Sequence, residues 1–140
     1  MPTSTAEATW TGALMDGSGT VTLGSGAYEG AYSFASRFED GDGTNPEELI
    51  GAAEAGCYAM ALANMLDENG YSPERIHAEA EVTLDADALE VTTVDLSVEG
   101  TVPDIDADGF GEFAEEAKNG CPISKALAGT DIQMTAELQG

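Results

Sequence analysis

One long predicted helix over residues 46–69, with an apolar middle, constrains the fold more than any other feature of this sequence. Asn45 suits a helix N-cap, Pro46 the first helical position, and Glu47 the positive end of the helix dipole. Gly70 is typical of the residue that ends a helix. Between these signals, apolar side chains occupy almost every side of the helix, and a helix of that kind is buried. The rest of the chain therefore has to cover a central helix.

The first third of the chain consists of short segments in which apolar and polar residues alternate, a pattern typical of strands. Glycine-rich turns at residues 16–19 and 24–26 separate these segments. We predict an antiparallel unit of three strands. The apolar residues that define the segments are Trp10 in the first, Val21 and Leu23 in the second, and Tyr28, Tyr32 and Phe34 in the third.

Two further strands are predicted after the central helix. Residues 76–84 alternate cleanly between apolar and polar side chains, so one face of this strand is expected to meet water. Residues 94–98 form the next strand. Val91 is out of phase with it, which indicates a bulge near Thr92 and Thr93.

The C-terminal part is predicted to contain two helices and a last strand. Apolar residues recur at helical spacing over residues 110–117 and end at Gly120, and Pro122 begins a short second helix through residue 128. Residues 132–138 alternate as a strand. The order βββ-α-ββ-α-α-β, with segregated helices, indicates an α+β fold. The length favours a single domain over residues 1–140.

The charge balance of the chain is extreme, with 27 acidic and 4 basic residues and a formal net charge of -23. Such a surface repels the phosphates of nucleic acids and anionic lipid headgroups, so neither partner is expected. High net charge also opposes compaction, which would favour disorder. The regular apolar pattern favours instead a folded protein adapted to concentrated salt, where screening removes most of the repulsion.

The expected compartment is the reducing cytoplasm. The N-terminus lacks the basic and apolar regions of a signal peptide. The longest apolar run, residues 55–63, is shorter than the ~18 residues that suggest a membrane span. In such a compartment a structural disulfide is disfavoured and a redox-active one is favoured.

Two cysteines are the first candidates for chemistry. Cys121 directly precedes Pro122 at a helix start, where backbone N–H groups and the helix dipole favour a thiolate. Cys57 lies inside the apolar helix, where Glu54, three residues earlier on the same side, is expected to raise its pKa. Cys57 therefore needs a cation from elsewhere in the fold. The alternative is that both cysteines simply pack in the core.

A metal site is disfavoured, because zinc needs three or four sulfur or imidazole ligands. The chain offers 2 cysteines and 1 histidine, and His77 falls on the polar face of a predicted strand. We expect no metal and no cofactor.

Arg37 stands out because the chain has so few basic residues. It falls at the predicted end of a strand, shortly before the N-cap of the central helix. Its guanidinium could hold a thiolate and a peroxide oxygen together. The alternative is an ordinary surface ion pair, which the many carboxylates would favour.

These residues lie in motifs that resemble a known family, the OsmC/Ohr hydroperoxide reductases, and its OsmC branch most closely. The resemblance spans nearly the whole chain, and the combination of an Asn-Pro-Glu segment before the first cysteine with a Cys-Pro-Ile-Ser segment is specific. The matching segments are Ser-Arg-Phe-Glu at 36–39, Gly-Thr-Asn-Pro-Glu-Glu-Leu-Ile-Gly-Ala-Ala at 43–53, Ala-Gly-Cys at 55–57, Val-Pro-Asp-Ile-Asp at 102–106, and Ala-Lys-Asn-Gly-Cys-Pro-Ile-Ser-Lys-Ala-Leu at 117–127.

The resemblance implies a thiol-dependent peroxidase that forms intertwined homodimers with sites at the subunit interface. It implies that Cys57 is the peroxidatic cysteine, that Cys121 is the resolving one, and that Arg37 and Glu47 activate the site. The implied reductant is a dithiol such as a dihydrolipoyl group. Glu54 departs from the family, which commonly has a neutral residue or histidine there.

Helix geometry adds an expectation about the dimer. Glu47 and Cys57 are ten residues apart in the sequence, which is roughly 15 Å of rise on one straight helix. One arginine could hardly reach both ends, so we expect Arg37 and Glu47 to reach Cys57 from the partner chain. The alternatives to an enzyme are a non-catalytic module that binds apolar ligands near Cys57 and a redox sensor on the same scaffold.

Overall fold

A computed structural model describes residues 1–139 of the chain. These residues form two compact units, one comprising Met1–Leu49 and the other beginning at Ile50. Each unit is described by itself below.

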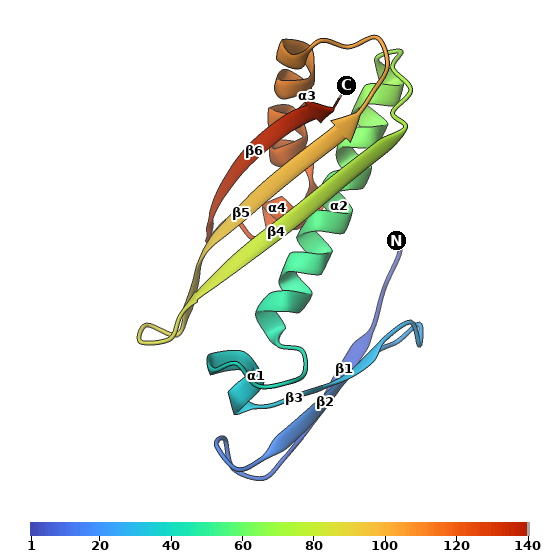
Figure 1. Cartoon of the computed structure of the whole chain (residues 1–140). Coiled ribbons are helices and arrows are strands. Elements are labelled where there is room, and N and C mark those ends of the chain that lie inside the picture. The colour runs from blue at the N-terminus through green and yellow to red at the C-terminus, as the bar shows by residue number, and fades with distance from the viewer. Residues whose placement is uncertain (140) are drawn as a thin grey trace. The chain divides into compact units, whose positions relative to one another are not determined.

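The first unit contains an antiparallel sheet, as the sequence predicts. Strands β1 (Ala6–Thr11), β2 (Ser18–Leu23) and β3 (Glu29–Tyr32) pair in that order, coloured blue in Figure 1. The prediction is wrong at Phe34, because a short helix, α1 (Phe34–Phe38), begins there. Ser33 caps this helix with a reciprocal pair of hydrogen bonds to Ser36, which is why the chain leaves the strand.

The central helix, α2 (Pro46–Glu68), begins at the predicted residue. The Asn45 side chain accepts a hydrogen bond of 2.7 Å from the backbone of Glu48, which confirms the N-cap. Gly70, which has a φ of 87°, follows the end of the helix.

The expectation that α2 is buried on all sides is wrong for the single chain. Its buried residues recur every three or four positions and so lie on one face, and the opposite face is exposed. The physical reason is that the apolar core of the second unit packs against only one side of the helix. The buried residues are Glu47, Gly51, Glu54, Tyr58, Leu62 and Leu66, and the exposed face carries Ala52, Ala53, Gly56 and Met60.

The second unit contains a mixed sheet in the order β4-β5-β6. Strands β4 (Arg75–Asp85) and β5 (Glu90–Thr101) are antiparallel, and β6 (Asp131–Gln139) joins β5 in parallel. Thr83 pairs with Thr93 but Leu84 pairs with Val91, so Thr92 is an extra residue. This confirms the predicted bulge.

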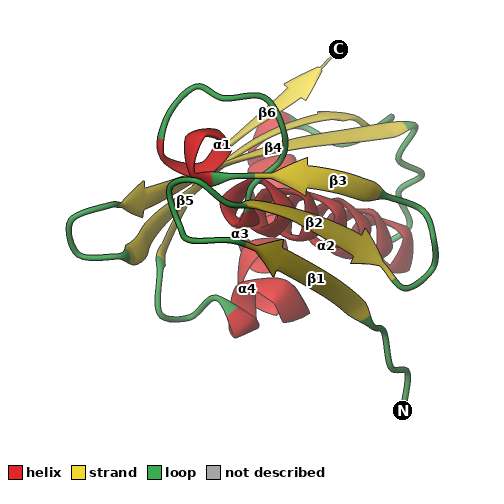
Figure 2. Ribbon diagram, turned by 90° about the horizontal axis from the view of Figure 1, so that it is seen from below, coloured by secondary structure: helices red, strands yellow, loops and turns green. Residues whose placement is uncertain are grey.

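Helices cover one face of this sheet. In Figures 1 and 2, α2 and α3 (Ala107–Gly120) lie on the same side of β4–β6, and the short α4 (Pro122–Ala126) follows α3. Helix α4 is two residues shorter than predicted. The predicted α+β class is confirmed, with α1 as an additional helix. The buried core of this unit consists of Tyr58, Leu62, Leu66, Leu96, Val98, Val102, Phe110, Ala114 and Ala117.

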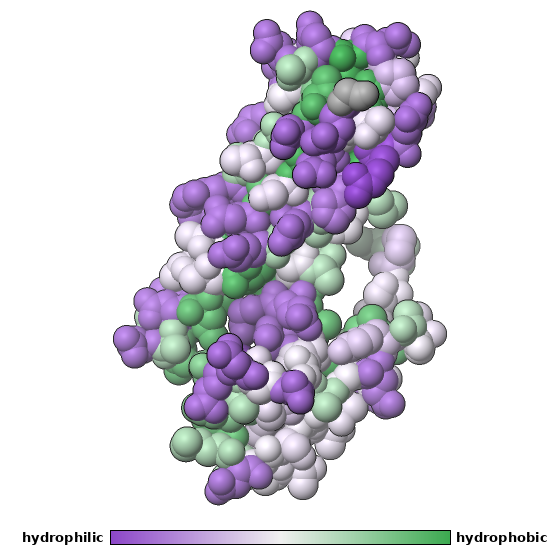
Figure 3. All heavy atoms as spheres, in the orientation of Figure 1, coloured by the Kyte–Doolittle hydropathy of each residue, from purple (hydrophilic) through white to green (hydrophobic). Residues whose placement is uncertain are grey.

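The other face of the sheet is polar, and Figure 3 shows it dominated by hydrophilic residues. His77, Glu79 and Glu81 alternate along β4 with half-buried apolar residues. This is the predicted strand with one wet face. By length and composition alone, α2 is long and apolar enough to cross a membrane, a property that it shares with core helices of soluble proteins.

Candidate active site

The two thiols meet in the second unit. Cys57 lies on α2, Cys121 lies between α3 and α4, and their Sγ atoms are 2.8 Å apart, with Cys121 as the donor. Both are free cysteines. Cys121 is fully buried and Cys57 is partly exposed, so an incoming reagent can approach Cys57 more easily. Two residues that are 64 positions apart in the sequence thus form one dithiol site.

The junction of two helices holds Cys121 in place. Its backbone N–H donates to Ala117 at the end of α3, and its backbone carbonyl accepts from Lys125 in α4. Pro122 at the first position of α4 ends the preceding helix and starts the next. The Cys121 side chain makes no helix-cap hydrogen bond. Its Sγ is therefore directed at Cys57 instead of at the backbone of α4.

The surroundings raise the pKa of the Cys57 thiol above its ordinary value. Burial is the largest cause, followed by the hydrogen bond with Cys121, and the negative charge of Glu54 adds to it. A hydrogen bond from the backbone of Ile123 acts in the opposite direction. The expected effect of Glu54 on Cys57 is confirmed. Within this unit the thiolate is disfavoured, and an added cation would be needed to favour it.

Glu54 is completely buried, which the sequence analysis missed. The Ser124 hydroxyl donates a hydrogen bond of 2.6 Å to Glu54 Oε1. Oε2 is also buried and has no hydrogen-bond partner among residues 1–139. The sequence does carry a signal for this contact. Glu54 precedes Cys57 by three residues and Ser124 follows Cys121 by three, so two helices that bring the cysteines together can also bring Glu54 to Ser124.

Arg37 and Glu47 form an ion pair in the first unit. Arg37 Nε donates to Glu47 Oε1 at 3.0 Å and Nη2 donates to Oε2 at 2.9 Å, a bidentate arrangement. Arg37 lies in the last turn of α1 and not at the end of a strand, as the sequence analysis expected. Glu47 lies in the first turn of α2. The bidentate bond fixes the guanidinium plane and leaves Nη1 free to bond to another group.

An aromatic hollow of about 440 Å³ lies beside Arg37 in the first unit. The Arg37 guanidinium lies 5.5 Å from the centre of the Phe38 ring. An apolar group with a polar end would suit this combination. The lining residues are Trp10, Gly12, Leu14, Tyr32, Ser33, Phe34, Arg37 and Phe38.

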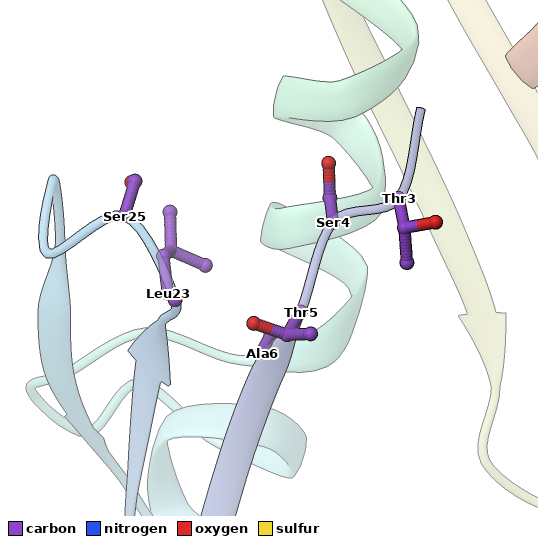
Figure 4. A pocket seen from close by; sticks show the side chains of 7 residues that line it. Thr3, Ser4, Thr5, Ala6, Leu23 and Ser25 are labelled. Carbon is purple, nitrogen blue, oxygen red and sulfur yellow. The ribbon is translucent and has the colours of Figure 1, made fainter. Parts of the chain in front are cut away.

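A larger hollow of about 570 Å³ lies between the N-terminal segment and the turn after β2 (Figure 4). No charged, thiol or imidazole group lines it, so it offers little for catalysis. Its lining residues are Thr3, Ser4, Thr5, Ala6, Leu23, Gly24 and Ser25.

His77 is exposed on the sheet, and residues 1–139 contain no cluster of three metal-binding side chains.

Replacing Glu54 by glutamine is expected to make Cys57 react with iodoacetamide faster at neutral pH. A raised thiol pKa means a smaller thiolate fraction at a given pH, and removal of the Glu54 charge lowers that pKa. The pH profile of Cys57 alkylation, measured by mass spectrometry of the peptide, should therefore move to lower pH. Glu68→Gln, an equal change of charge at the exposed end of α2, is the matched control. A profile that stays in place or moves upward contradicts this prediction.

The α+β fold and the two facing thiols define a small dithiol protein. The OsmC family, described as OsmC-like protein, matches residues 39–137. Peroxiredoxin OsmC of Escherichia coli (strain K12) is 47% identical over 124 residues, which cover 86% of this chain and 87% of that protein. This chain belongs to the OsmC family, as its motifs predict.

One further protein is similar to this chain in sequence, and one solved structure is similar to it in fold. Organic hydroperoxide resistance protein-like 2 of Staphylococcus epidermidis (strain ATCC 35984) is 30% identical over 105 residues and covers 72% of each chain. The crystal structure of an OsmC-like protein from Mycoplasma pneumoniae has a TM-score of 0.77 and covers 99% of each chain at 15% identity. This second likeness shows that the fold is shared.

Proposed function

We propose that this protein is a thiol-dependent peroxidase that reduces organic hydroperoxides to alcohols. The observation that carries the proposal is the pair of thiols, 2.8 Å apart, with one sulfur partly exposed and the other buried behind it. Two of the relatives described above are named as a peroxiredoxin and as an organic hydroperoxide resistance protein, which supports the same chemistry.

The first step is attack by the Cys57 thiolate on one peroxide oxygen. An S–O bond forms, the O–O bond breaks, and the departing alkoxide takes a proton to become an alcohol, leaving Cys57 as a sulfenic acid. In the second step Cys121 attacks the Cys57 sulfur, the S–O bond breaks, and water leaves as the disulfide forms. A dithiol reductant, such as a dihydrolipoyl group, then reduces the disulfide and is itself oxidised.

Arg37 and Glu47 are proposed to supply the cation that Cys57 lacks. The bidentate bond with Glu47 holds the guanidinium in one orientation, and the remaining N–H groups can face a thiolate and a peroxide oxygen. The aromatic hollow beside Arg37 would hold the apolar part of the hydroperoxide. This favours alkyl or fatty hydroperoxides over hydrogen peroxide.

We propose that the active form is a homodimer in which Arg37 and Glu47 act on Cys57 of the partner chain. The exposed face of α2 carries Ala52, Ala53 and Gly56, residues small enough to permit close approach by a second copy. Met60, which is 75% exposed in the single chain, would be covered there. Glu47 and Cys57 are ten residues apart on α2, which is roughly 15 Å of helix rise. An arginine bound to Glu47 can therefore hardly reach Cys57 of the same chain, which supports a site shared between two chains.

Steady-state assays test the peroxidase function directly. Cumene hydroperoxide should be consumed when dihydrolipoamide is supplied, and slowly or not at all with glutathione. A non-catalytic binding module would consume no peroxide, and a redox sensor would oxidise once without turning over. Either result would overturn the proposed function.

Mixing two inactive variants tests whether the site is shared between chains. A Cys57→Ser chain keeps Arg37, and an Arg37→Ala chain keeps Cys57, so a mixed dimer regains one complete site only if Arg37 acts across the interface. Random mixing should restore about a quarter of the wild-type activity, because half of the dimers are mixed and each has one working site. No recovery after denaturation and refolding of the mixture would place Arg37 and Cys57 in the same chain's site.

We further propose a cytoplasmic protein that is adapted to concentrated salt, on the basis of its net charge of -23. Self-repulsion among carboxylates destabilises the folded state at low ionic strength, and molar salt shortens the Debye length to roughly 3 Å. The melting temperature should therefore rise by at least about 10 °C between 50 mM and 2 M KCl, which corresponds to roughly 3 kcal/mol. The measurement is thermal unfolding followed by circular dichroism. A melting temperature that is independent of salt would contradict the adaptation.

A further inference from the structure

Two pairs of residues connect α2 to α4, and they are arranged alike. Glu54 and Cys57 are three residues apart on one face of α2, and Cys121 and Ser124 are three residues apart at the start of α4. Cys57 meets Cys121 at 2.8 Å, and Glu54 meets Ser124 at 2.6 Å. The first residue of each pair thus meets the second residue of the other.

Helix α4 needs such contacts to hold its place. It comprises the five residues Pro122–Ala126, which is too short for a helix to be stable by itself. Ser124 and Cys121 are both buried against α2. A hydrogen bond between Ser124 and a completely buried carboxylate therefore restricts both the position and the rotation of α4 relative to Cys57.

The buried carboxylate would be costly if it had no role. Glu54 Oε2 has no hydrogen-bond partner among the described residues, and the Glu54 charge disfavours the Cys57 thiolate. An apolar residue would avoid both penalties but could not accept the Ser124 hydroxyl. Packing of α2 alone would therefore favour an apolar residue at position 54, and the hydrogen bond with Ser124 gives a reason for a glutamate there.

We infer that Glu54 and Ser124 are positioning residues for disulfide formation, and that their hydrogen bond keeps Cys121 aligned with Cys57. The inference rests on the proposed pairing of these two thiols as a redox couple. In the step concerned, an S–S bond forms between Cys121 and the Cys57 sulfenic acid, the S–O bond of Cys57 breaks, and water leaves. The sulfurs have to approach from 2.8 Å to about 2.05 Å, so a small displacement of α4 is enough to delay the reaction.

Variants at both residues separate the hydrogen bond from the charge. Glu54→Ala removes both, Ser124→Ala removes the bond and keeps the charge, and Glu54→Gln keeps an acceptor oxygen without the charge. Each reduced protein is mixed with one equivalent of cumene hydroperoxide, and sulfenic acid and disulfide are followed by dimedone labelling and mass spectrometry. We expect the sulfenic acid to persist at least tenfold longer in both alanine variants and to have a nearly normal lifetime in Glu54→Gln.

A second measurement does not depend on peroxidase activity. The equilibrium between the Cys57–Cys121 disulfide and glutathione, at pH 7, reports how well the folded chain aligns the two thiols. Both alanine variants should shift this equilibrium about tenfold toward the dithiol, with Glu54→Gln close to wild type. The double variant Glu54→Ala/Ser124→Ala should be no worse than either single one, because the bond is already lost.

The outcomes are distinguishable. A normal equilibrium and a normal sulfenic acid lifetime in both folded alanine variants would show that the bond has no part in disulfide formation, and would overturn the inference. A Glu54→Gln variant as slow as Glu54→Ala would assign the effect to the charge and overturn it as well. If the wild-type protein forms no sulfenic acid, the proposed peroxidase function fails, and the glutathione equilibrium alone decides the inference.

Discussion

Replacing Cys57 by serine is expected to lower peroxidase turnover by about 10³-fold or more, because the variant has no nucleophilic sulfur at the accessible position of the site. Cys121 cannot substitute for it easily, because its side chain is fully buried. The assay is cumene hydroperoxide consumption with dihydrolipoamide as the reductant. A hydroxyl replaces a partly exposed thiol of similar size, so the variant should fold normally.

The matched variant is Cys121→Ser, which should behave differently. It keeps the attacking sulfur, so it should consume one equivalent of peroxide and accumulate a sulfenic acid at Cys57 that dimedone traps. Turnover with a dithiol should fall, because no internal disulfide forms for the reductant to attack.

The two variants also settle which thiol attacks. Cys121 lies at the start of α4, and burial and Glu54 raise the pKa of Cys57, so the roles of the two thiols have to be tested directly. Peroxide consumption that survives in Cys57→Ser and is lost in Cys121→Ser would reverse the proposed roles. The same pattern would remove the need for Arg37 at Cys57.

Replacing Arg37 by alanine is expected to lower kcat/KM for the hydroperoxide by about 10²–10³-fold, the usual effect of removing one fixed donor from a developing negative charge. The thiolate fraction of Cys57 should fall at the same time, because the proposed cation is gone. The measurements are steady-state kinetics and the pH profile of Cys57 alkylation. Arg37→Lys should recover only part of the loss, because an ammonium group cannot form the two parallel bonds to Glu47.

The stability of the same variants separates a catalytic effect from unfolding. The Arg37 side chain is 37% exposed, and ion pairs at such positions contribute about 1 kcal/mol or less to stability. Thermal unfolding of Arg37→Ala should therefore change little. Arg75→Ala, which removes the other arginine from an exposed position on β4, is the matched control and should keep full activity. Equal losses in both variants, or none in Arg37→Ala, would make Arg37 an ordinary surface residue.

Local sequence signals predicted most of the secondary structure. The N-cap at Asn45, the start of α2 at Pro46 and the bulge near Thr92 follow from short-range backbone and side-chain preferences, and all three are confirmed. The prediction was wrong at Phe34, where Ser33 and Ser36 cap each other and begin α1. Two serines at that spacing can be recognised in a sequence, but the aromatic residues beside them favoured a strand.

The sequence by itself determined the α+β class and the family, because these depend on periodicity and on motifs, and it named the two cysteines as candidates for redox chemistry. Tertiary structure alone decided that Cys57 and Cys121 lie in contact and that Glu54 is buried against Ser124. These contacts join residues at least 64 positions apart, and no local preference encodes which face of α4 meets α2. Packing of the apolar core sets that orientation, and the distances that matter for the chemistry follow from it.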